Sequence, residues 1–399
     1  MTTRARLPRT ADVYRQGVHA GVLERTTAGA VFTYDPPPVE SIAYRLPLQR
    51  GSSATRIETR GVNLHPFFAG LLPEGARMRA LVRRVKTSED DLMSLLVAAG
   101  EDCIGDVSVL PSGAPPTAST AAETLKLDEV LFAELFAKSL AAPNEPTIAG
   151  VQDKVSASMI SFPLRMRGAA YILKLNPADM PRLVENEHFF LQMARACGLP
   201  AATSTLVHDR DENAGLLVER FDRIKEAGAD LRKLHQEDAC QFLERYPADK
   251  YLVTCSEIAT ALTELATVPI VEMARLLRLV AFSYLIANGD LHAKNISLFT
   301  APKTSRIALT PAYDLLSTLP YGDRTMAMQL DGRDDNLKSR TFLAFGLRHG
   351  VRERATRALL DELCDLALPW IARLEEIGLP KKKTTDLARV MKKRRDDLR

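Results

Sequence analysis

The chain has 399 residues and a mass of 44.0 kDa, enough for two or three domains that each bury a core of their own. With 46% hydrophobic and 26% charged residues, the composition is that of an ordinary globular protein and excludes a largely disordered chain. A net charge of +3 is too small to indicate nucleic acid as the main ligand.

Neither a membrane segment nor a secretory signal is expected. The sequence contains no uninterrupted apolar run of about 18 residues, the length a membrane-spanning helix needs. Its start, MTTRARLPRTADVYRQG, has no apolar segment of the kind found in signal peptides. The five cysteines are scattered and include no CxxC pair, which is typical of reduced core residues. We therefore expect a cytoplasmic protein.

Residues 1–110 are predicted to form a small α+β subdomain. In GVLERTTAGAVFTYD, two strand-like runs flank a turn that contains glycine. The stretches PFFAGLLPEGARMRALVRRV and SEDDLMSLLVAAG follow with helical patterns, and Ser88 with Asp91 three residues later indicates the start of the second helix. No catalytic cluster stands out here.

The segment PSGAPPTASTAAET has no helical or strand period and predicts a linker over residues 111–126. Beyond it, LDEVLFAELFAKSL predicts an amphipathic helix, AAYILKLN a strand, and LVENEHFFLQMARACGLP a helix that ends at Gly198 and Pro200. From about Arg223 onward helical patterns dominate, notably VEMARLLRLVAFSYLIA. Two regions are therefore expected, over residues 127–222 and 223–399.

Lys174 is the first candidate functional residue. Strand alternation places it on the same face as Ala170 and Ile172, where its ammonium group could bind nucleotide phosphates and Ile172 could cover an adenine ring. Glu187 begins an apolar stripe on the following helix, and a buried charge requires an opposite charge, so Glu187 is its expected partner. The alternative is a solvent-exposed lysine on an edge strand.

The stretches NGDLHAKN and LTPAYDLLS supply the remaining chemistry. Asp290 and Asn295 stand five residues apart, like the Asp and Asn of the kinase catalytic loop HRDxxxxN. Asp290 could orient an acceptor hydroxyl, while Asn295 and Asp314 could bind Mg²⁺ beside the phosphates. A lone DxxxxN is more often only a capped loop. The prediction rests on five such residues occurring in the order that a kinase-like fold requires.

Two further residues of this loop and one glycine complete the candidates. His292 and Lys294 follow the aspartate, whereas protein kinases usually place the histidine before it, and both could contact phosphate. His292 could equally be a hydrogen-bonded structural residue. No GxGxxG occurs, so TIAGVQDK, with Gly150 permitting a tight turn, is the best candidate for the phosphate loop.

Several separated motifs resemble the HipA family of bacterial serine/threonine kinase toxins. The likeness covers roughly residues 10–350 and is carried by FFAGLLPEGARMRALV, EDCIGDVSVLP, TIAGVQDK, LVENE, LLVERFDR, HQEDACQ, GDLHAKN and LTPAYDLLS, in that order. The resemblance implies an α+β, two-lobed protein-kinase-like fold with a small N-terminal subdomain, an N-lobe over residues 127–222 and a helical C-lobe over residues 223–399.

The resemblance also implies a site for ATP and Mg²⁺. Asp290 would be the catalytic carboxylate, assisted by His292 and Lys294, and Asn295 and Asp314 would bind the metal. The implied nucleotide contacts are Ala149, Gly150, Val151, Gln152, Asp153, Lys154, Lys174, Glu219, Arg220, Phe221, His292, Ala293, Lys294, Asn295, Tyr313 and Asp314.

Family members phosphorylate proteins, aminoacyl-tRNA synthetases among them, and so halt translation and growth. The resemblance implies a small DNA-binding antitoxin similar to HipB as partner, through which the pair would contact operator DNA and repress its own operon. The family autophosphorylates a serine at the start of the phosphate loop; here that position is Thr147, which keeps the hydroxyl but is β-branched.

Two alternative functions remain open from the sequence, and so does the role of the basic C-terminal tail. The chain could be a small-molecule kinase, since aminoglycoside-type enzymes use a related loop, although the HipA-like N-terminal segment argues against this. It could be a non-catalytic partner of an antitoxin, although the retained Lys174, Asp290, Asn295 and Asp314 argue against that. The basic runs KKK and KKRR in the last twenty residues are either a solvated helix face or a DNA-facing patch.

Overall fold

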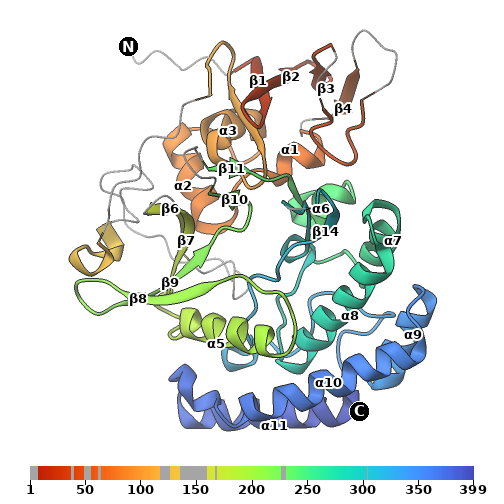
Figure 1. The fold of residues 1–399 in the computed structure, drawn as a ribbon. Helices are drawn as coiled ribbons and strands as arrows, with labels where there is room; N and C mark the ends of the chain where they lie inside the picture. Colours follow the sequence, from red (N-terminus) through yellow and green to blue (C-terminus); the bar gives the residue numbers. More distant parts are fainter. Residues whose placement is uncertain are drawn as a thin grey trace.

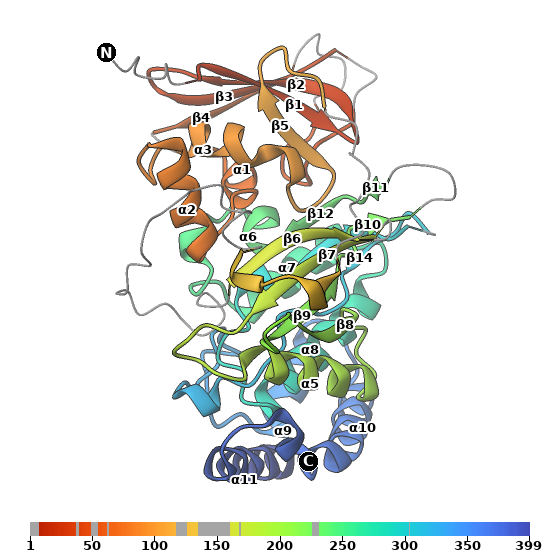
Figure 2. The same ribbon diagram turned by 90° about the vertical axis from the view of Figure 1, so that its left-hand side faces the viewer.

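A computed structural model describes residues 8–36, 40–48, 55–61, 64–116, 126–134, 160–166, 169–225, 231–302 and 304–399. Over these residues the fold is α+β. Three regions follow one another along the molecule, with the N-terminal sheet at one end and the C-terminal helices at the other (Figures 1 and 2). In the described part of the chain, no helix is both long and apolar enough to cross a membrane.

The N-terminal region is one antiparallel sheet with three helices beside it. Its strands are β1 (Thr10–Arg15), β2 (Val18–Arg25), β3 (Gly29–Tyr34), β4 (Arg56–Arg60) and β5 (Val107–Pro111), in the order β4-β3-β2-β1-β5. The hairpin expected in GVLERTTAGAVFTYD is confirmed as β2 and β3. The helices are α1 (Pro66–Gly70), α2 (Gly75–Val85) and α3 (Leu92–Ala99).

The predicted start of α3 was wrong by one turn. The helix begins at Leu92, and Asp91 rather than Ser88 caps it by accepting a hydrogen bond from the amide of Ser94. Asp91 also accepts a 2.5 Å hydrogen bond from Arg25 on β2, which fixes the cap against the sheet. That tertiary contact is absent from the local sequence pattern.

The middle region is a second antiparallel sheet with the strand order β6-β7-β9-β8. Its strands are β6 (Ile160–Met166), β7 (Ala169–Leu175), β8 (Ser204–His208) and β9 (Ala214–Glu219), and α5 (Leu183–Ala196) packs against it (Figure 2). Because β7 lies between β6 and β9, Lys174 is not on an edge strand. Residues 135–159, which include the predicted phosphate loop and the last part of the predicted helix after the linker, lie outside the described residues. The described beginning of that helix is a short 3₁₀ helix, Leu127–Glu129.

The C-terminal region is mainly helical and contains the largest apolar core. Its helices are α6 (Ala239–Phe242), α7 (Cys255–Leu265), α8 (Pro269–Leu285), α9 (Ser339–Arg348), α10 (Glu353–Ile371) and α11 (Lys381–Leu398). Its short strands are β10 (Arg223–Ile224), β11 (Arg232–Lys233), β12 (Gln236–Asp238), β13 (Ser297–Thr300) and β14 (Ile307–Leu309). The core gathers buried side chains from α5, α7, α8, α10 and α11. All five cysteines belong to the described residues, and each is a buried free thiol, as expected.

A buried polar contact joins the N-terminal region to the rest. His235 lies between the carboxylates of Asp106, at 2.9 Å, and Glu237, also at 2.9 Å. Glu237 in turn accepts a 2.7 Å hydrogen bond from the amide of Tyr44. Burial would lower the pKa of His235, but the hydrogen bonds that its ring donates to both carboxylates raise the pKa to about 9. The imidazolium therefore links the two regions by charge.

Candidate active site

The structure brings together three of the predicted residues around one ammonium group. Lys174 on β7 donates to both oxygens of Glu187 on α5, at 2.7 and 2.8 Å, and also contacts the carboxylate of Asp314. Lys174 is 8% exposed and Glu187 is fully buried, which excludes the alternative of a solvated edge lysine. A strand, a helix and the segment after β14 thus converge on one cation.

Two acidic side chains share one ammonium group in this cluster. Burial alone would lower the pKa of Lys174, but the charges of Asp314 and Glu187 raise it above its ordinary value. Burial raises the pKa of Glu187 to about 7, with the ammonium opposing and Asp314 reinforcing the shift. Lys174 therefore stays charged, and its two acidic partners compete for one ammonium group.

Asp314 has an uncommon backbone. Its φ angle is 54°, in the left-handed region that side chains other than glycine seldom adopt. Such conformations persist where the surroundings hold them, and they occur often at functional sites. Asp314 keeps about 29% of its side chain exposed, so its carboxylate is open to a ligand as well as to Lys174.

The predicted catalytic loop leaves the C-terminal end of α8 and leads into β13. Asp290 is 1% exposed, and its backbone carbonyl accepts a 2.9 Å hydrogen bond from the side-chain nitrogen of Asn295. This bond closes the loop on itself. Because the amide nitrogen of Asn295 is used in this way, the amide oxygen is the atom that could bind a metal.

Tyr251, which the sequence did not indicate, contacts Asp290 directly. Its phenol donates a 2.9 Å hydrogen bond to Asp290 Oδ1, and its ring meets the ring of His292 edge-on at 5.1 Å. Burial and the charge of Asp290 raise the pKa of Tyr251. Tyr251 lies 39 residues before Asp290 in no recognisable motif, so only the tertiary structure identifies it.

Lys294 extends toward the N-terminal region. Its ammonium contacts Asp238 at 2.5 Å and the carbonyl of Gly70, at the end of α1, at 3.3 Å. Burial would lower the pKa of Lys294, but the charges of Asp238 and Glu74 raise it. Lys294 therefore anchors the loop, and Ala293 adds to this because its amide donates to the carbonyl of Lys250 at 3.1 Å.

The predicted hinge follows β9 and divides its side chains between two environments. Glu219 ends the strand and is exposed. Phe221 meets the ring of Tyr313 at 5.8 Å, and the hydroxyl of Tyr313 donates to the carbonyl of Lys294 at 2.7 Å. This pair could flank an aromatic base next to the catalytic loop.

Arg220 instead turns its guanidinium toward the N-terminal region. It donates to Asp222, at 2.8 and 3.0 Å, to Asp102 at 3.2 Å and to the carbonyl of Cys103. Burial opposes ionisation of Asp102, but the charges of Arg220 and Arg223 lower its pKa to about 2. A nucleotide contact from Arg220 would therefore have to come from its backbone.

The residues present fit a nucleotide-bound Mg²⁺ better than a metal bound by protein alone. Among the described residues, no group of three or more His, Cys, Asp or Glu side chains is arranged to hold a metal ion. Mg²⁺ in nucleotide sites uses one or two protein carboxylates together with phosphate oxygens and water. Asp314 and the amide oxygen of Asn295 match that donor set. The predicted phosphate loop with Thr147 and residues 149–154 lies outside the described residues.

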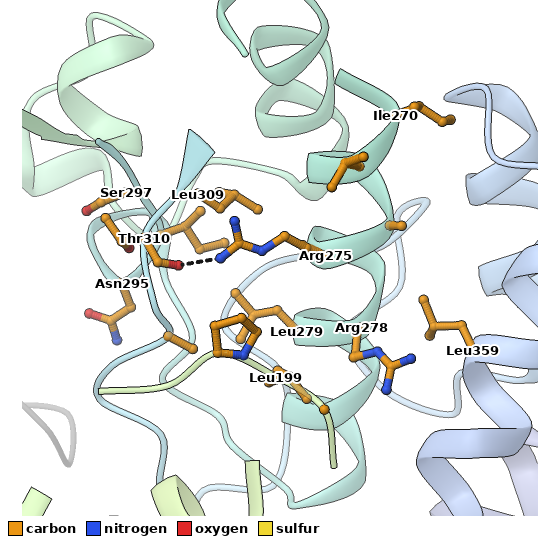
Figure 3. A pocket seen from close by; sticks show the side chains of 16 residues that line it. Leu199, Ile270, Arg275, Arg278, Leu279, Asn295, Ser297, Leu309, Thr310 and Leu359 are labelled. Carbon is orange, nitrogen blue, oxygen red and sulfur yellow. Dashed lines mark hydrogen bonds between the residues drawn. The ribbon is translucent and has the colours of Figure 1, made fainter. Parts of the chain in front are cut away.

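An apolar pocket of about 380 Å³ lies behind the catalytic loop, on the side of α8 (Figure 3). It is lined by Leu199, Leu279 and Leu309, with Arg275 bridging to the carbonyl of Thr310 at 3.2 Å. Its described lining includes Asn295 but neither Lys174 nor Asp314, so it is not the candidate nucleotide site.

Two family models match the chain over most of its length. The model for the HipA-like C-terminal domain matches residues 147–371, more than half of the chain, and the model for the HipA N-terminal domain matches residues 11–110. The chain belongs to the HipA family. The HipA-like C-terminal match contains the Lys174 cluster and the loop with Asp290, whereas α11 lies beyond it.

Individual relatives agree with the family models. A Sinorhizobium fredii protein named "Putative kinase Y4mE" is 30% identical over 335 residues, covering 78% of this chain and 79% of that protein. A second from the same organism, Y4dM, is 29% identical over 377 residues, covering 88% of this chain and 85% of that protein.

A solved structure shares the whole fold. It is the complex of HipA, HipB and operator DNA from Shewanella oneidensis, in which the matching chain superposes with a TM-score of 0.74. The match covers 97% of this chain and 96% of that one at 21% identity. The α+β HipA fold predicted from the sequence is therefore confirmed.

Proposed function

We propose that this HipA-like protein is an ATP-dependent kinase that phosphorylates serine or threonine in another protein. The observation that carries the proposal is the buried cluster of Lys174, Glu187 and Asp314. The loop of Asp290 and Asn295 belongs to the same HipA-like domain. Phosphoryl transfer needs a cation at the phosphates, a carboxylate at the acceptor and metal ligands between them. These side chains supply each part.

Each residue would have a distinct task. Lys174, held by Glu187, would bind the phosphates, and Asp314 with Asn295 would hold Mg²⁺. MgATP, when bound, supplies the phosphoryl group and neutralises the charge that develops during transfer. Asp290 would accept a hydrogen bond from the substrate hydroxyl and so direct the hydroxyl oxygen of the substrate at the phosphorus atom. Tyr251 would keep the Asp290 carboxylate in that orientation.

The biological role that we propose is that of a toxin in a toxin-antitoxin pair. The Shewanella relative was solved as a complex with HipB and operator DNA, which supports a small DNA-binding antitoxin similar to HipB as the partner here, acting in the cytoplasm and repressing the shared operon. A translation protein such as an aminoacyl-tRNA synthetase is the expected acceptor.

The test compares wild type with Asp290→Asn in cells, with growth and the phosphoproteome followed in the same cultures. The proposal predicts that the wild-type protein arrests growth and labels one or a few proteins, and that the variant does neither. A small-molecule kinase would consume ATP without labelling protein. A non-catalytic antitoxin partner would give the same result for wild type and Asp290→Asn. ATP consumption without protein labelling, or equal behaviour of the two proteins, would reject the proposal.

A further inference from the structure

The last helix, α11, buries an arginine in its apolar face. Its inward-facing side chains recur at intervals of three and four residues, the spacing of one helix face. They are Thr384, Leu387, Met391, Arg394 and Leu398. Arg394 is only 5% exposed, although it belongs to a run of four basic residues that composition alone would leave in solvent.

The guanidinium of Arg394 lies at the end of α8. It donates to the carbonyl of Tyr284 at 2.7 Å and lies 4.4 Å from the centre of the Tyr284 ring. It also donates to the carbonyl of Arg324 at 2.8 Å and to Asp335 at 3.1 Å. The final carbonyl groups of a helix lack partners within the helix and favour a nearby cation. Arg394 places a cation at the point where α8 ends, on a carbonyl that also accepts a 3.1 Å hydrogen bond from the amide of Ala287.

Both carbonyl partners of Arg394 belong to segments that touch the catalytic loop. Tyr284 is six residues before Asp290 on the same helix-to-loop connection. The segment of Arg324 lies against Gly289, where an added Cβ atom would come within 2.5 Å of Asp323 and 2.6 Å of the carbonyl of Thr325. The side chain of Arg394 therefore binds both the end of α8, which precedes Asp290, and the segment 323–325, which lies against Gly289.

We propose that Arg394 is a positioning residue for the catalytic loop, so that α11 sets the placement of Asp290 from the far end of the chain. This inference rests on the proposed kinase function, because the effect on Asp290 matters only if that carboxylate orients an acceptor. Arg394 touches neither Lys174, Glu187 nor Asp314 in its described contacts. Its loss should therefore affect phosphoryl transfer rather than nucleotide binding.

The experiment uses the full-length protein as wild type, Arg394→Gln, Arg394→Lys and Arg395→Gln. The neighbouring Arg395 is a matched control, because it also donates to a backbone carbonyl, that of Cys364 on α10, at 2.9 Å. Active sites are counted by binding of a non-hydrolysable ATP analogue, and kcat per binding site and KM for ATP are then measured. Hydrogen exchange is followed at residues 287–290 and 323–325.

For Arg394→Gln we expect kcat per nucleotide-binding site to fall roughly ten- to hundredfold, because small displacements of a catalytic group are costly. KM for ATP should stay within about twofold of wild type. Exchange at residues 287–290 and 323–325 should accelerate, Arg394→Lys should recover part of kcat, and Arg395→Gln should match wild type in both measurements.

A purely stabilising role for Arg394 would give a different result. The melting temperature would fall, but kcat per nucleotide-binding site and local exchange would match those of Arg395→Gln, and the inference would be wrong. If the wild-type protein transfers no phosphate at all, the kinase proposal fails on its own. Hydrogen exchange then still decides whether Arg394 holds the loop, since unchanged exchange at both segments would overturn that link.

Discussion

The phenol of Tyr251 donates a 2.9 Å hydrogen bond to the carboxylate of Asp290. This bond joins the segment before α7 to the loop after α8. Lys250, the residue before Tyr251, donates a 2.9 Å hydrogen bond to Glu74 of the N-terminal region. Two neighbouring residues thus contact the N-terminal subdomain and the proposed catalytic carboxylate, respectively.

Replacing Tyr251 by Phe should lower kcat about tenfold while leaving the fold intact, because a hydrogen bond to a charged group contributes roughly 1.5–3 kcal/mol. The ring contact with His292 would be kept. Kinase assays at saturating ATP measure the effect, and Tyr246→Phe, a substitution of the same chemistry outside the loop, is the control. Equal kcat values for the two variants would show that Tyr251 does not orient Asp290.

Replacing Lys174 by Met should weaken binding of an ATP analogue by at least tenfold, because the ammonium group would no longer meet the phosphates. It should also lower the free energy of unfolding by about 3 kcal/mol, since removing one partner leaves Glu187 as a buried unpaired charge. Calorimetry measures the first quantity and urea unfolding the second.

A double variant separates these two effects of Lys174. Adding Glu187→Met to Lys174→Met removes the unpaired carboxylate and should restore much of the stability, but not the affinity for the ATP analogue. Lys126→Met, at an exposed lysine, is the surface control. Wild-type affinity in the Lys174 variant would contradict a phosphate-binding role.

The free energy of unfolding should depend on pH through His235. Its pKa is about 9 in the folded protein, against an ordinary value of 6.5, so the folded state holds the extra proton between these limits. This stabilisation is complete below about pH 6.5 and is lost as the pH rises through about 9. Its full size is on the order of 3 kcal/mol.

Unfolding in urea at intervals from pH 6 to about 9.5 would test the role of His235. His235→Gln should be less stable than wild type at low pH and should lose the decline in this window. His208→Gln, at an exposed histidine on β8, should keep it. A wild-type profile that rises with pH would reverse the sign that the ion pairs require.

Thr147 lies outside the described residues, so its modification is predicted from the family resemblance alone. A phosphate there would add roughly −1.5 to −2 charges beside the ATP phosphates and should repel nucleotide. Incubation with MgATP followed by mass spectrometry should show phosphorylated Thr147 together with falling activity, and Thr147→Ala should stay active. An active enzyme with unmodified Thr147 would show that this switch has been lost.

Local patterns predicted the parts of the site that short segments determine. The alternation around Lys174, the stripe that begins at Glu187 and the five-residue spacing of Asp290 and Asn295 are all properties of one strand, helix or loop. The contacts of Lys174 with Glu187 and Asp314 agree with the order of the motifs along the chain. The hairpin of β2 and β3 was predictable for the same reason, because its pairing is local.

Contacts between distant segments were not predictable in this way. Lys294 and Arg220 were expected at the nucleotide, but Asp238 and Asp102 bind their side chains and reach them only in the folded chain. Arg394 is an intermediate case. Its basic neighbours suggested a solvated face, yet the interval of three residues from Met391 already placed it on the buried stripe of α11.

The most direct test of the kinase account is transfer of labelled γ-phosphate from ATP to protein by the purified chain, with Asp290→Asn measured in parallel. The account predicts Mg²⁺-dependent labelling by wild type and a loss of about a hundredfold or more in the variant, with ATP-analogue binding preserved. Asp386→Asn, on the surface of α11, should behave as wild type. Equal labelling by wild type and Asp290→Asn would contradict the assignment of Asp290 as the catalytic carboxylate.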